Sequence, residues 1–245
     1  MSKRNKAAER AARAAALKAE RERQERLRRI LTIGAVVAGI VIIIGGGFFI
    51  QSQRDSTGND AAAPAGATAA YGVAVGDAGA THEVVIYEDF LCPVCGVLEA
   101  EAGDALTSAV EDGRARVEFR PVNFLSRFGD FSMDAANAFA VVLDAEGPEV
   151  AKTFHDLVYA DQPAEDADDF PGSDWFIDKA VEAGASEEAV RTGIEEGTFE
   201  GWVDNATGAA SEAGVNGTPT VLLDGEPVPG STIGEVAANL EAGLQ

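Results

Sequence analysis

The sequence predicts an α/β domain preceded by a single membrane-spanning helix, and three observations lead to this fold class. A strand, a helix and a second strand open the globular part, a block of helices follows, and two strands and a helix close it. A long stretch without charged residues comes before all of these elements. Strands separated by a helix in this way are typical of a sheet that contains a parallel pair.

The uncharged stretch is ILTIGAVVAGIVIIIGGGFFI, residues 30–50, in which Thr32 is the only clearly polar side chain. As a helix it spans roughly 31 Å, which matches a hydrocarbon core of about 30 Å. A buried helix of a soluble protein would show a polar stripe, and this stretch has none. A cleaved signal peptide is the alternative, but its apolar core is usually about 7–15 residues long. We therefore expect an uncleaved signal anchor.

The residues before the anchor, 1–29, are basic and indicate its orientation. Residues 1–30 carry 11 Lys or Arg and 4 Asp or Glu, whereas residues 51–245 carry a net charge of −29. The positive-inside rule keeps residues 1–29 in the cytoplasm and exports the rest across the cell membrane. A nucleic-acid-binding basic helix is the alternative. The mixture of Glu, Arg and Ala favours a solvated helix with charge pairs, so we expect no nucleic-acid partner.

A polar, Pro- and Gly-containing spacer over residues 51–70 separates the anchor from a globular domain over residues 71–245. HEVVIYEDF, residues 82–90, is β-branched and aromatic and predicts a strand. Apolar residues at three- and four-residue steps predict a helix from Pro93 to about Glu111. RARVEFRPV, residues 114–122, alternates as a second strand. This βαβ unit predicts a parallel pair of strands.

A helical insertion is predicted over about residues 130–214. Helical patterns cover residues near 132–146, 148–160, 173–183, 186–196 and 198–213, and 161–172 reads as a loop. Two strands within residues 217–230 follow, joined at Asp224-Gly225, which is a strong hairpin signal. A final helix is expected from about Thr232 to Ala242.

The chain has only two cysteines, Cys92 and Cys95, and both lie where the first strand passes into the first helix. Unpaired backbone N–H groups and the helix dipole stabilise an anion at a helix N-terminus. The Cys92 thiol should therefore have a lowered pKa and attack disulfides readily. The three-residue spacing lets Cys95 reach back and resolve a mixed disulfide. The pair is interpreted as a redox-active dithiol.

Three other uses of a cysteine pair fit the sequence less well. A structural zinc site needs four ligands, and the chain has no second cysteine pair. Its only histidines, His82 and His155, are expected to be surface or capping residues, so no metal site is predicted. A structural disulfide across so short a loop removes little chain entropy. A merely buried apolar pair would need neither the intervening proline nor the helix start.

Two motifs, in their order and separation, carry a resemblance to a known family. YEDFLCPVCG, followed by the helical block and then by GVNGTPTVLLDG, resembles the exported bacterial DsbA-like thiol–disulfide oxidoreductases over roughly residues 71–245. The resemblance implies a thioredoxin fold with a helical insertion and no cofactor. It also implies that Cys92 is the exposed attacking cysteine and Cys95 the more buried resolving one. Thr218 and Pro219 match the cis-proline loop that pairs with the substrate backbone, the alternative for Pro219 being an ordinary strand-start proline.

The sequence departs from the family pattern at two positions. The dipeptide between the cysteines is Pro93-Val94, whereas the strongest oxidants of the family carry His at the second position. Valine offers the Cys92 thiolate neither charge nor hydrogen bond, so a milder oxidant is expected. Relatives often place a buried carboxylate six residues before the first cysteine, where this chain has Ile86. Glu88 lies on the same strand face and could take over proton transfer, or it could be an exposed acid at the strand end.

The predicted function is that of a membrane-tethered enzyme that oxidises or rearranges cysteines of reduced or misoxidised exported proteins. The resemblance implies that a quinone-linked membrane partner reoxidises it. A disulfide reductase or isomerase of the same fold is the alternative. A non-catalytic ectodomain with a structural Cys92–Cys95 disulfide, which holds a partner protein, is the alternative from another class. The acidic surface is not explained by redox chemistry.

Overall fold

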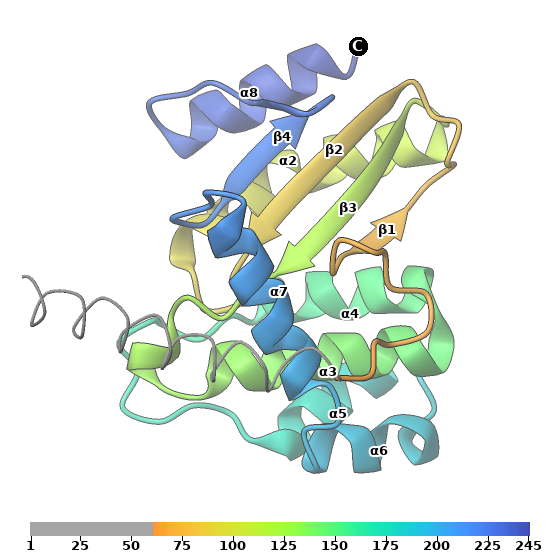
Figure 1. Ribbon diagram of the computed structural model, residues 1–245, viewed down its shortest axis with the longest axis vertical. Helices are drawn as coiled ribbons and strands as arrows, with labels where there is room; N and C mark the ends of the chain where they lie inside the picture. The colour runs from red at the N-terminus through yellow and green to blue at the C-terminus, as the bar shows by residue number, and fades with distance from the viewer. Residues whose placement is uncertain (1–60) are drawn as a thin grey trace, which may run out of the picture. The chain divides into compact units, whose positions relative to one another are not determined.

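The computed structural model describes residues 61–245, which form a five-stranded sheet with helices around it (Figure 1). The strand order is β1-β3-β2-β4-β5. The strands are β1 (Val73–Val75), β2 (His82–Glu88), β3 (Ala115–Pro121), β4 (Thr220–Leu223) and β5 (Glu226–Pro227). The predicted parallel pairing of β2 with β3 is confirmed, and every other pair in the sheet is antiparallel.

The predicted leader, the membrane anchor over residues 30–50 and the first half of the spacer lie outside the described residues. Among residues 61–245, none of the helices combines the length and the hydropathy that a membrane span requires.

Helix α2 (Pro93–Glu111) links β2 to β3 and begins and ends where the sequence predicts. Pro93 occupies the first turn, where its missing N–H removes no helical hydrogen bond. Leu98, Ala102 and Leu106 form its buried face. Gly113 follows the helix with φ of 68°, a left-handed conformation that glycine adopts without strain. The position of α2 fixes the two cysteines at the end of β2.

The helical insertion lies between β3 and β4 and begins with a short 3₁₀ turn, η1 (Ser126–Phe128). Its helices are α3 (Phe131–Glu146), α4 (Pro148–Ala160), α5 (Ser173–Glu182), α6 (Glu187–Glu195) and α7 (Glu200–Glu212). The last helix is α8 (Ile233–Gly243). These bounds agree with the predicted block and final helix to within one or two residues.

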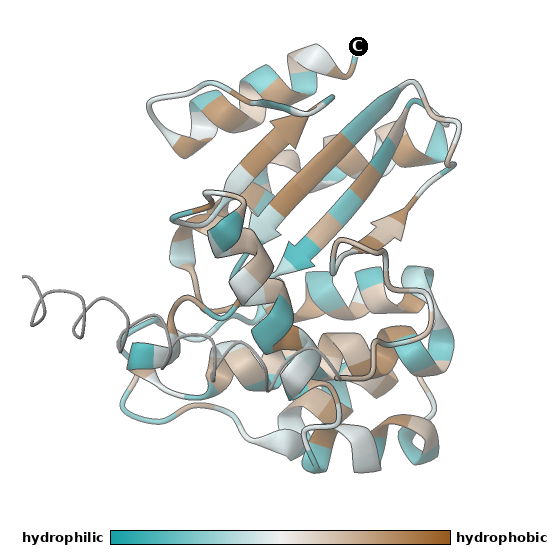
Figure 2. Cartoon of the chain, in the orientation of Figure 1, coloured by the Kyte–Doolittle hydropathy of each residue, from teal (hydrophilic) through white to brown (hydrophobic). Residues whose placement is uncertain are grey.

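Both faces of the central strand β2 are buried, with alternate residues pointing to different clusters. Val84 and Ile86 belong to the main core. Val85 and Tyr87 belong to a smaller cluster that includes Ala210 of α7. In Figure 1, α7 lies over one face of the sheet and α2 over the other, with α8 beside α2. Figure 2 shows the apolar character of β2 and β4 between these layers.

The turn between β4 and β5 is the hairpin that the sequence predicts. Asp224 and Gly225 both have positive φ, 52° and 85°, as the type I′ turn of a two-residue hairpin requires. The Asp224 carboxylate also accepts a hydrogen bond from the backbone N–H of Glu83, at 2.9 Å. The turn is thereby attached to the start of β2. Strand β1 and the 3₁₀ turn η1 are not predicted from the sequence.

Candidate active site

Cys92 is the N-cap residue of α2, with an extended backbone conformation, and Cys95 lies in the first turn. The backbone N–H groups of Cys95 and Gly96 donate to the Cys92 carbonyl oxygen, at 3.0 and 3.3 Å. The extended end of β2 feeds into the helix through Phe90 and Leu91, which are both buried. The structure therefore places the dithiol at the helix start that the sequence predicts, with both cysteines as free thiols.

The environment of Cys92 stabilises its thiolate. Hydrogen bonds lower the Cys92 pKa to about 6, and the largest contribution is the hydrogen bond from the Cys95 side chain. The Thr218 side chain and the backbone N–H groups of Val94 and Cys95 contribute further hydrogen bonds, while burial opposes the shift. Burial raises the pKa of the Cys95 thiol well above its usual value. At neutral pH, Cys92 is thus the nucleophile and Cys95 remains a protonated hydrogen-bond donor.

Cys92 is less accessible than the resemblance implies. It is 6% exposed, and Cys95 is 1% exposed, so the expectation of an exposed attacking cysteine is wrong for Cys92 in this conformation. Its side chain contacts the Thr218 loop. A cavity of about 550 Å³ nevertheless reaches Cys92, and its apolar lining includes Val94, Phe124, Leu125 and Val215.

The loop before β4 faces the dithiol. The Thr218-Pro219 peptide bond is cis. The Thr218 carbonyl oxygen lies 3.4 Å from Cys92 Sγ. The Thr220 hydroxyl donates to the Gly217 carbonyl at 2.8 Å and braces the loop. Thr218 and Pro219 are therefore brought together with the cysteines although they follow them by more than 120 residues.

Asp89 anchors the turn that carries Cys92, and the sequence analysis did not assign it this structural role. Its side chain is completely buried, and burial raises its pKa. Its carboxylate accepts hydrogen bonds from the backbone N–H groups of Leu91, Phe124 and Leu125 and from the Ser132 hydroxyl, at 2.6–3.0 Å. One side chain thus joins the cysteine turn to the segment after β3 and to the start of α3.

Two residues of the helical insertion hold the same turn from the other side. The Gln162 side chain donates to the carbonyl oxygens of Phe90 and Cys92, at 2.8 and 3.0 Å. The Tyr159 hydroxyl donates to the Asp89 carbonyl at 3.2 Å. Neither residue is predicted from the sequence, because both contacts join segments about 70 residues apart. In the sequence, Tyr159 is recognisable only as an aromatic residue on the apolar face near the end of an amphipathic helix, and this pattern does not identify its hydrogen-bond partner.

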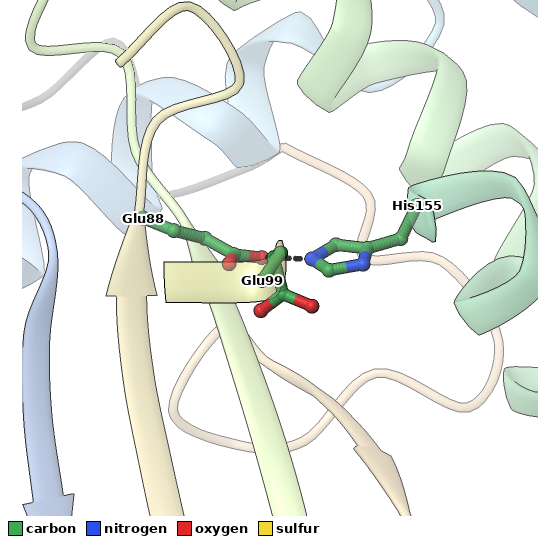
Figure 3. A group of neighbouring side chains, drawn as sticks. All are labelled: Glu88, Glu99 and His155. Atoms are coloured by element: carbon green, nitrogen blue, oxygen red, sulfur yellow. Dashed lines mark hydrogen bonds and ion pairs between the residues drawn. The ribbon is translucent and has the colours of Figure 1, made fainter. Parts of the chain in front are cut away.

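Glu88 lies at the end of β2 and is 1% exposed, so it is not an exposed acid at a strand end. Its Oε1 lies 2.7 Å from Nε2 of His155, which is completely buried in α4. The expectation that His155 is a surface or capping residue is therefore wrong. Glu99 of α2 lies beside this pair, and Figure 3 shows the three side chains pointing toward one another.

Four aromatic rings surround the His155 imidazole: Phe90, Phe119, Phe139 and Tyr159, with ring centroids at 4.6–5.8 Å. Burial alone would lower the His155 pKa, but the charges of Glu88 and Glu99 raise it to about 9. Burial raises the pKa of Glu99. The Glu88 charge also contributes to the raised pKa of Cys95, which relates this buried cluster electrostatically to the dithiol.

Comparison with known proteins gives a consistent result. The thioredoxin family model matches residues 68–242. A reduced disulfide bond oxidoreductase, DsbG, from Mycobacterium tuberculosis is 30% identical, with a TM-score of 0.62 over 72% of this chain and 88% of that one. DsbA from the same organism is 29% identical, with a TM-score of 0.60 over 71% and 92% of the two chains.

A third similar structure is the thiol-disulfide oxidoreductase MdbA from Corynebacterium diphtheriae. It is 26% identical, with a TM-score of 0.61 over 74% of this chain and 96% of the other. No functionally curated protein matches the chain. The residues that the family model matches include both cysteines and the cis-proline loop.

Proposed function

The chain belongs to the DsbA-like thiol–disulfide oxidoreductases of the thioredoxin family, and from this premise we propose that it is a membrane-tethered oxidase that forms disulfides in exported proteins. The observation that carries the oxidoreductase chemistry is the position of Cys92 at the start of α2, where hydrogen bonds from the Cys95 and Thr218 side chains lower its pKa and its protonated thiol can donate to the Thr218 carbonyl. A stabilised thiolate makes Cys92 a good leaving group, which favours handing the disulfide on to a client.

The oxidase reaction begins with the Cys92–Cys95 disulfide. A client thiolate attacks Cys92 Sγ, the Cys92–Cys95 bond breaks, and Cys95 leaves with the electron pair and takes up a proton. A second client thiolate then attacks the client sulfur of the mixed disulfide, and Cys92 leaves as a thiolate. The client has lost two electrons and the enzyme has gained them. A quinone-linked membrane oxidase is the proposed acceptor that restores the enzyme disulfide.

The residues around Cys92 suit an extended client. The cavity beside Cys92 has apolar side chains for client residues next to the reacting cysteine. The Thr218-Pro219 loop offers backbone groups to the client backbone. Val94 is 46% exposed beside the same cavity. Reduced, unfolded exported proteins are therefore the proposed clients.

Glu88 is the proposed proton-transfer residue for Cys95. Cys95 needs a proton when it leaves, because its pKa is well above the usual value. Glu88 is buried, interacts electrostatically with Cys95 and is hydrogen-bonded to His155. Replacing Glu88 by Gln should slow the step that releases Cys95 and leave the initial reactivity of the Cys92 thiolate within about threefold. Single-turnover kinetics separate the two steps.

A disulfide reductase is the second candidate, and the Cys92 pKa of about 6 is what favours it. This value is nearer to that of thioredoxin, about 7, than to that of the strongest oxidant, about 3.5. A reductase would draw electrons through the membrane and attack client disulfides with the Cys92 thiolate.

Incubation with a reduced, unfolded client tests the proposal. The oxidised full-length chain should transfer its disulfide and lose one disulfide per client disulfide formed. Cys92→Ser should abolish transfer, and Cys95→Ser should accumulate mixed disulfides on Cys92. No thiol exchange by the wild-type chain would favour the non-catalytic ectodomain instead. Mixed disulfides trapped on Cys95 would reverse the assigned roles.

Membrane tethering has a separate test. A protease added outside intact cells should cut within residues 51–70 and release the domain, while residues 1–29 stay protected. A mature chain that begins after residue 60 would instead indicate a cleaved signal peptide.

A further inference from the structure

Three side chains from three different elements meet in the interior behind the dithiol. Glu88 ends β2, Glu99 lies in α2, and His155 lies in α4 of the helical insertion. Each offers one ligand atom, and these atoms all lie within 4.8 Å of one another (Figure 3). Two carboxylates and one imidazole in a largely buried position are a donor set that divalent first-row metals accept.

Two carboxylate oxygens of this cluster have no hydrogen-bond partner. Among the described residues, the buried side-chain atoms that lack a partner include Glu88 Oε2 and Glu99 Oε1. A buried, unpaired carboxylate oxygen is costly, and the Glu88 side chain is almost completely removed from solvent. The single proton that His155 directs at Glu88 satisfies Oε1 and leaves both of these oxygens unpaired. A cation between them would satisfy both.

His155 is oriented as a metal-binding histidine is. Its Nδ1 lies 3.0 Å from Asp156 Oδ1, while Nε2 points toward the two glutamates. Metal-ligating histidines commonly donate their other ring N–H to a carboxylate, which fixes the tautomer. Asp156 is itself held by Lys152, whose positive charge also acts on Glu99 and lowers the pKa of that carboxyl against the effect of burial.

A cavity borders the cluster at Glu99. It has a volume of about 340 Å³ and lies between α2 and α4, with Gly96, Lys152, Asp156 and Tyr159 also in its lining. Of the three ligands, only Glu99 lines this cavity, so an ion would approach the cluster from the Glu99 side. The absence of a side chain at Gly96 keeps this region of α2 open, although Gln162 already approaches it.

We infer that Glu88 Oε2, Glu99 Oε1 and His155 Nε2 form a binding site for one divalent first-row metal ion, with Zn²⁺ as the preferred occupant. Zinc accepts carboxylate oxygen and imidazole nitrogen in tetrahedral sites and tolerates a water as the fourth ligand. A divalent charge balances the two carboxylates while His155 is neutral. Calcium and magnesium prefer all-oxygen ligand sets and fit the imidazole less well.

Metal binding has two consequences for this fold. The ion would displace the Nε2 proton of His155, so that binding releases a proton and weakens as the pH falls. It would also join β2, α2 and α4, and so fasten the helical insertion to the domain that carries the cysteines. Because it occupies Glu88, it competes with proton transfer at that residue. The site itself does not depend on the direction of electron flow.

No metal site is predicted from the sequence, because the three ligands are separated by 11 and 56 residues and match no spacing motif. The free cysteines would bind zinc as well, so the test uses the full-length chain with Cys92 and Cys95 oxidised to the disulfide and with metal removed by a chelator. Titration with Zn²⁺ is followed by calorimetry, and titration with Co²⁺ is followed by its absorption spectrum.

We expect one Zn²⁺ per chain, proton release that depends on the buffer, and a thermal unfolding midpoint that rises with Zn²⁺ concentration. Glu99→Gln should weaken binding by at least about tenfold. Glu101→Gln, an exposed glutamate of the same helix, should leave it unchanged. If Glu99→Gln does not fold, X-ray absorption spectroscopy of the wild-type zinc form identifies the ligands instead. We expect one imidazole nitrogen, with oxygen atoms as all the other ligands.

No stoichiometric binding by the folded, oxidised chain would overturn the inference and leave the cluster as a hydrogen-bonded histidine and two glutamates. Binding that Glu99→Gln does not weaken, or a zinc spectrum with sulfur ligands or without imidazole, would also overturn it. Client oxidation is measured separately on the same preparation, so failure of the metal site and failure of the proposed function give different results.

Discussion

The hydrogen bond between the two cysteines should control the reactivity of Cys92, and its removal is the sharpest test of the active-site geometry. The lowering of the Cys92 pKa from 9.0 to about 6 corresponds to about 4 kcal/mol in favour of the thiolate. At pH 7 roughly 90% of Cys92 is then ionised, against about 1% for the unperturbed thiol. The Cys95 side chain is the largest cause of this shift.

The matched variants are Cys95→Ala, which removes the side chain that donates a hydrogen bond to Cys92, and Cys95→Ser, which keeps a hydroxyl donor at that position. A hydrogen bond to a charged acceptor is worth about 1.5–3 kcal/mol, so Cys95→Ala should raise the Cys92 pKa by roughly one to two units. Cys95→Ser should stay within about half a unit of the wild-type value. The assay is the pH dependence of Cys92 alkylation in the reduced full-length chain, checked by thiolate absorbance.

Equal midpoints in the Ala and Ser variants, both close to wild type, would refute this reasoning and assign the shift to the backbone N–H groups of the helix start. A wild-type midpoint at or above about 8 would refute the thiolate assignment altogether. The gain in reactivity is expected to be modest. A fall of about three pKa units lowers intrinsic nucleophilicity by roughly 20-fold, which offsets most of the roughly 90-fold gain in ionised thiol at pH 7.

Three further predictions concern stability and redox poise. Asp89→Asn should lower the free energy of unfolding by about 2–3 kcal/mol in denaturant titrations, because an amide cannot accept all four hydrogen bonds and its NH₂ group faces backbone donors. Exposed Asp204→Asn is the control with no expected change, and equal stability of the two variants would contradict the anchoring role. Gln162→Ala should lower the free energy of unfolding by about 1–2 kcal/mol and increase protease cleavage near the cysteine turn, since the carbonyls of Phe90 and Cys92 lose their donor. Unchanged cleavage would mean that Gln162 does not hold the turn. The reduction potential against glutathione should be roughly −230 mV, interpolated at a Cys92 pKa of about 6 between thioredoxin (pKa about 7, −270 mV) and the strongest oxidant (pKa about 3.5, −120 mV). A value at or below about −270 mV would replace the oxidase by the reductase.

Local patterns in the sequence predict most of the fold. The change from alternating to helical periodicity locates β2, α2 and β3, and the Asp-Gly pair locates the β4–β5 turn, because each signal acts within a few residues. Strand β1 is missed because Val73–Val75 is only three residues long and depends on pairing with β3. Such a strand is stabilised by its partner and not by its own sequence.

The active site likewise contains residues that local sequence predicts and residues that depend on tertiary packing. The positions of Cys92 and Cys95 at a helix start follow from the local sequence, and the family resemblance supplies Thr218 and Pro219. The buried pair of Glu88 and His155 could not be found, since it depends on how α4 packs against the end of β2. One signal was available: His155 follows Phe154 and precedes Val158 on the apolar face of its helix, where a polar residue needs a buried partner.

Val94 indicates how this active site divides its tasks. In the strongest oxidants of the family a histidine at this position stabilises the thiolate, and here the side chain is apolar and 46% exposed. The largest stabilising contribution to the Cys92 thiolate comes instead from Cys95, with further hydrogen bonds from Thr218 and from the backbone at the helix start. The side chain at position 94 therefore need not stabilise the thiolate. It lines the cavity with Phe124 and Val215, where a client would lie. A substitution that enlarges or shrinks this side chain should therefore change which clients are oxidised more than it changes the Cys92 pKa.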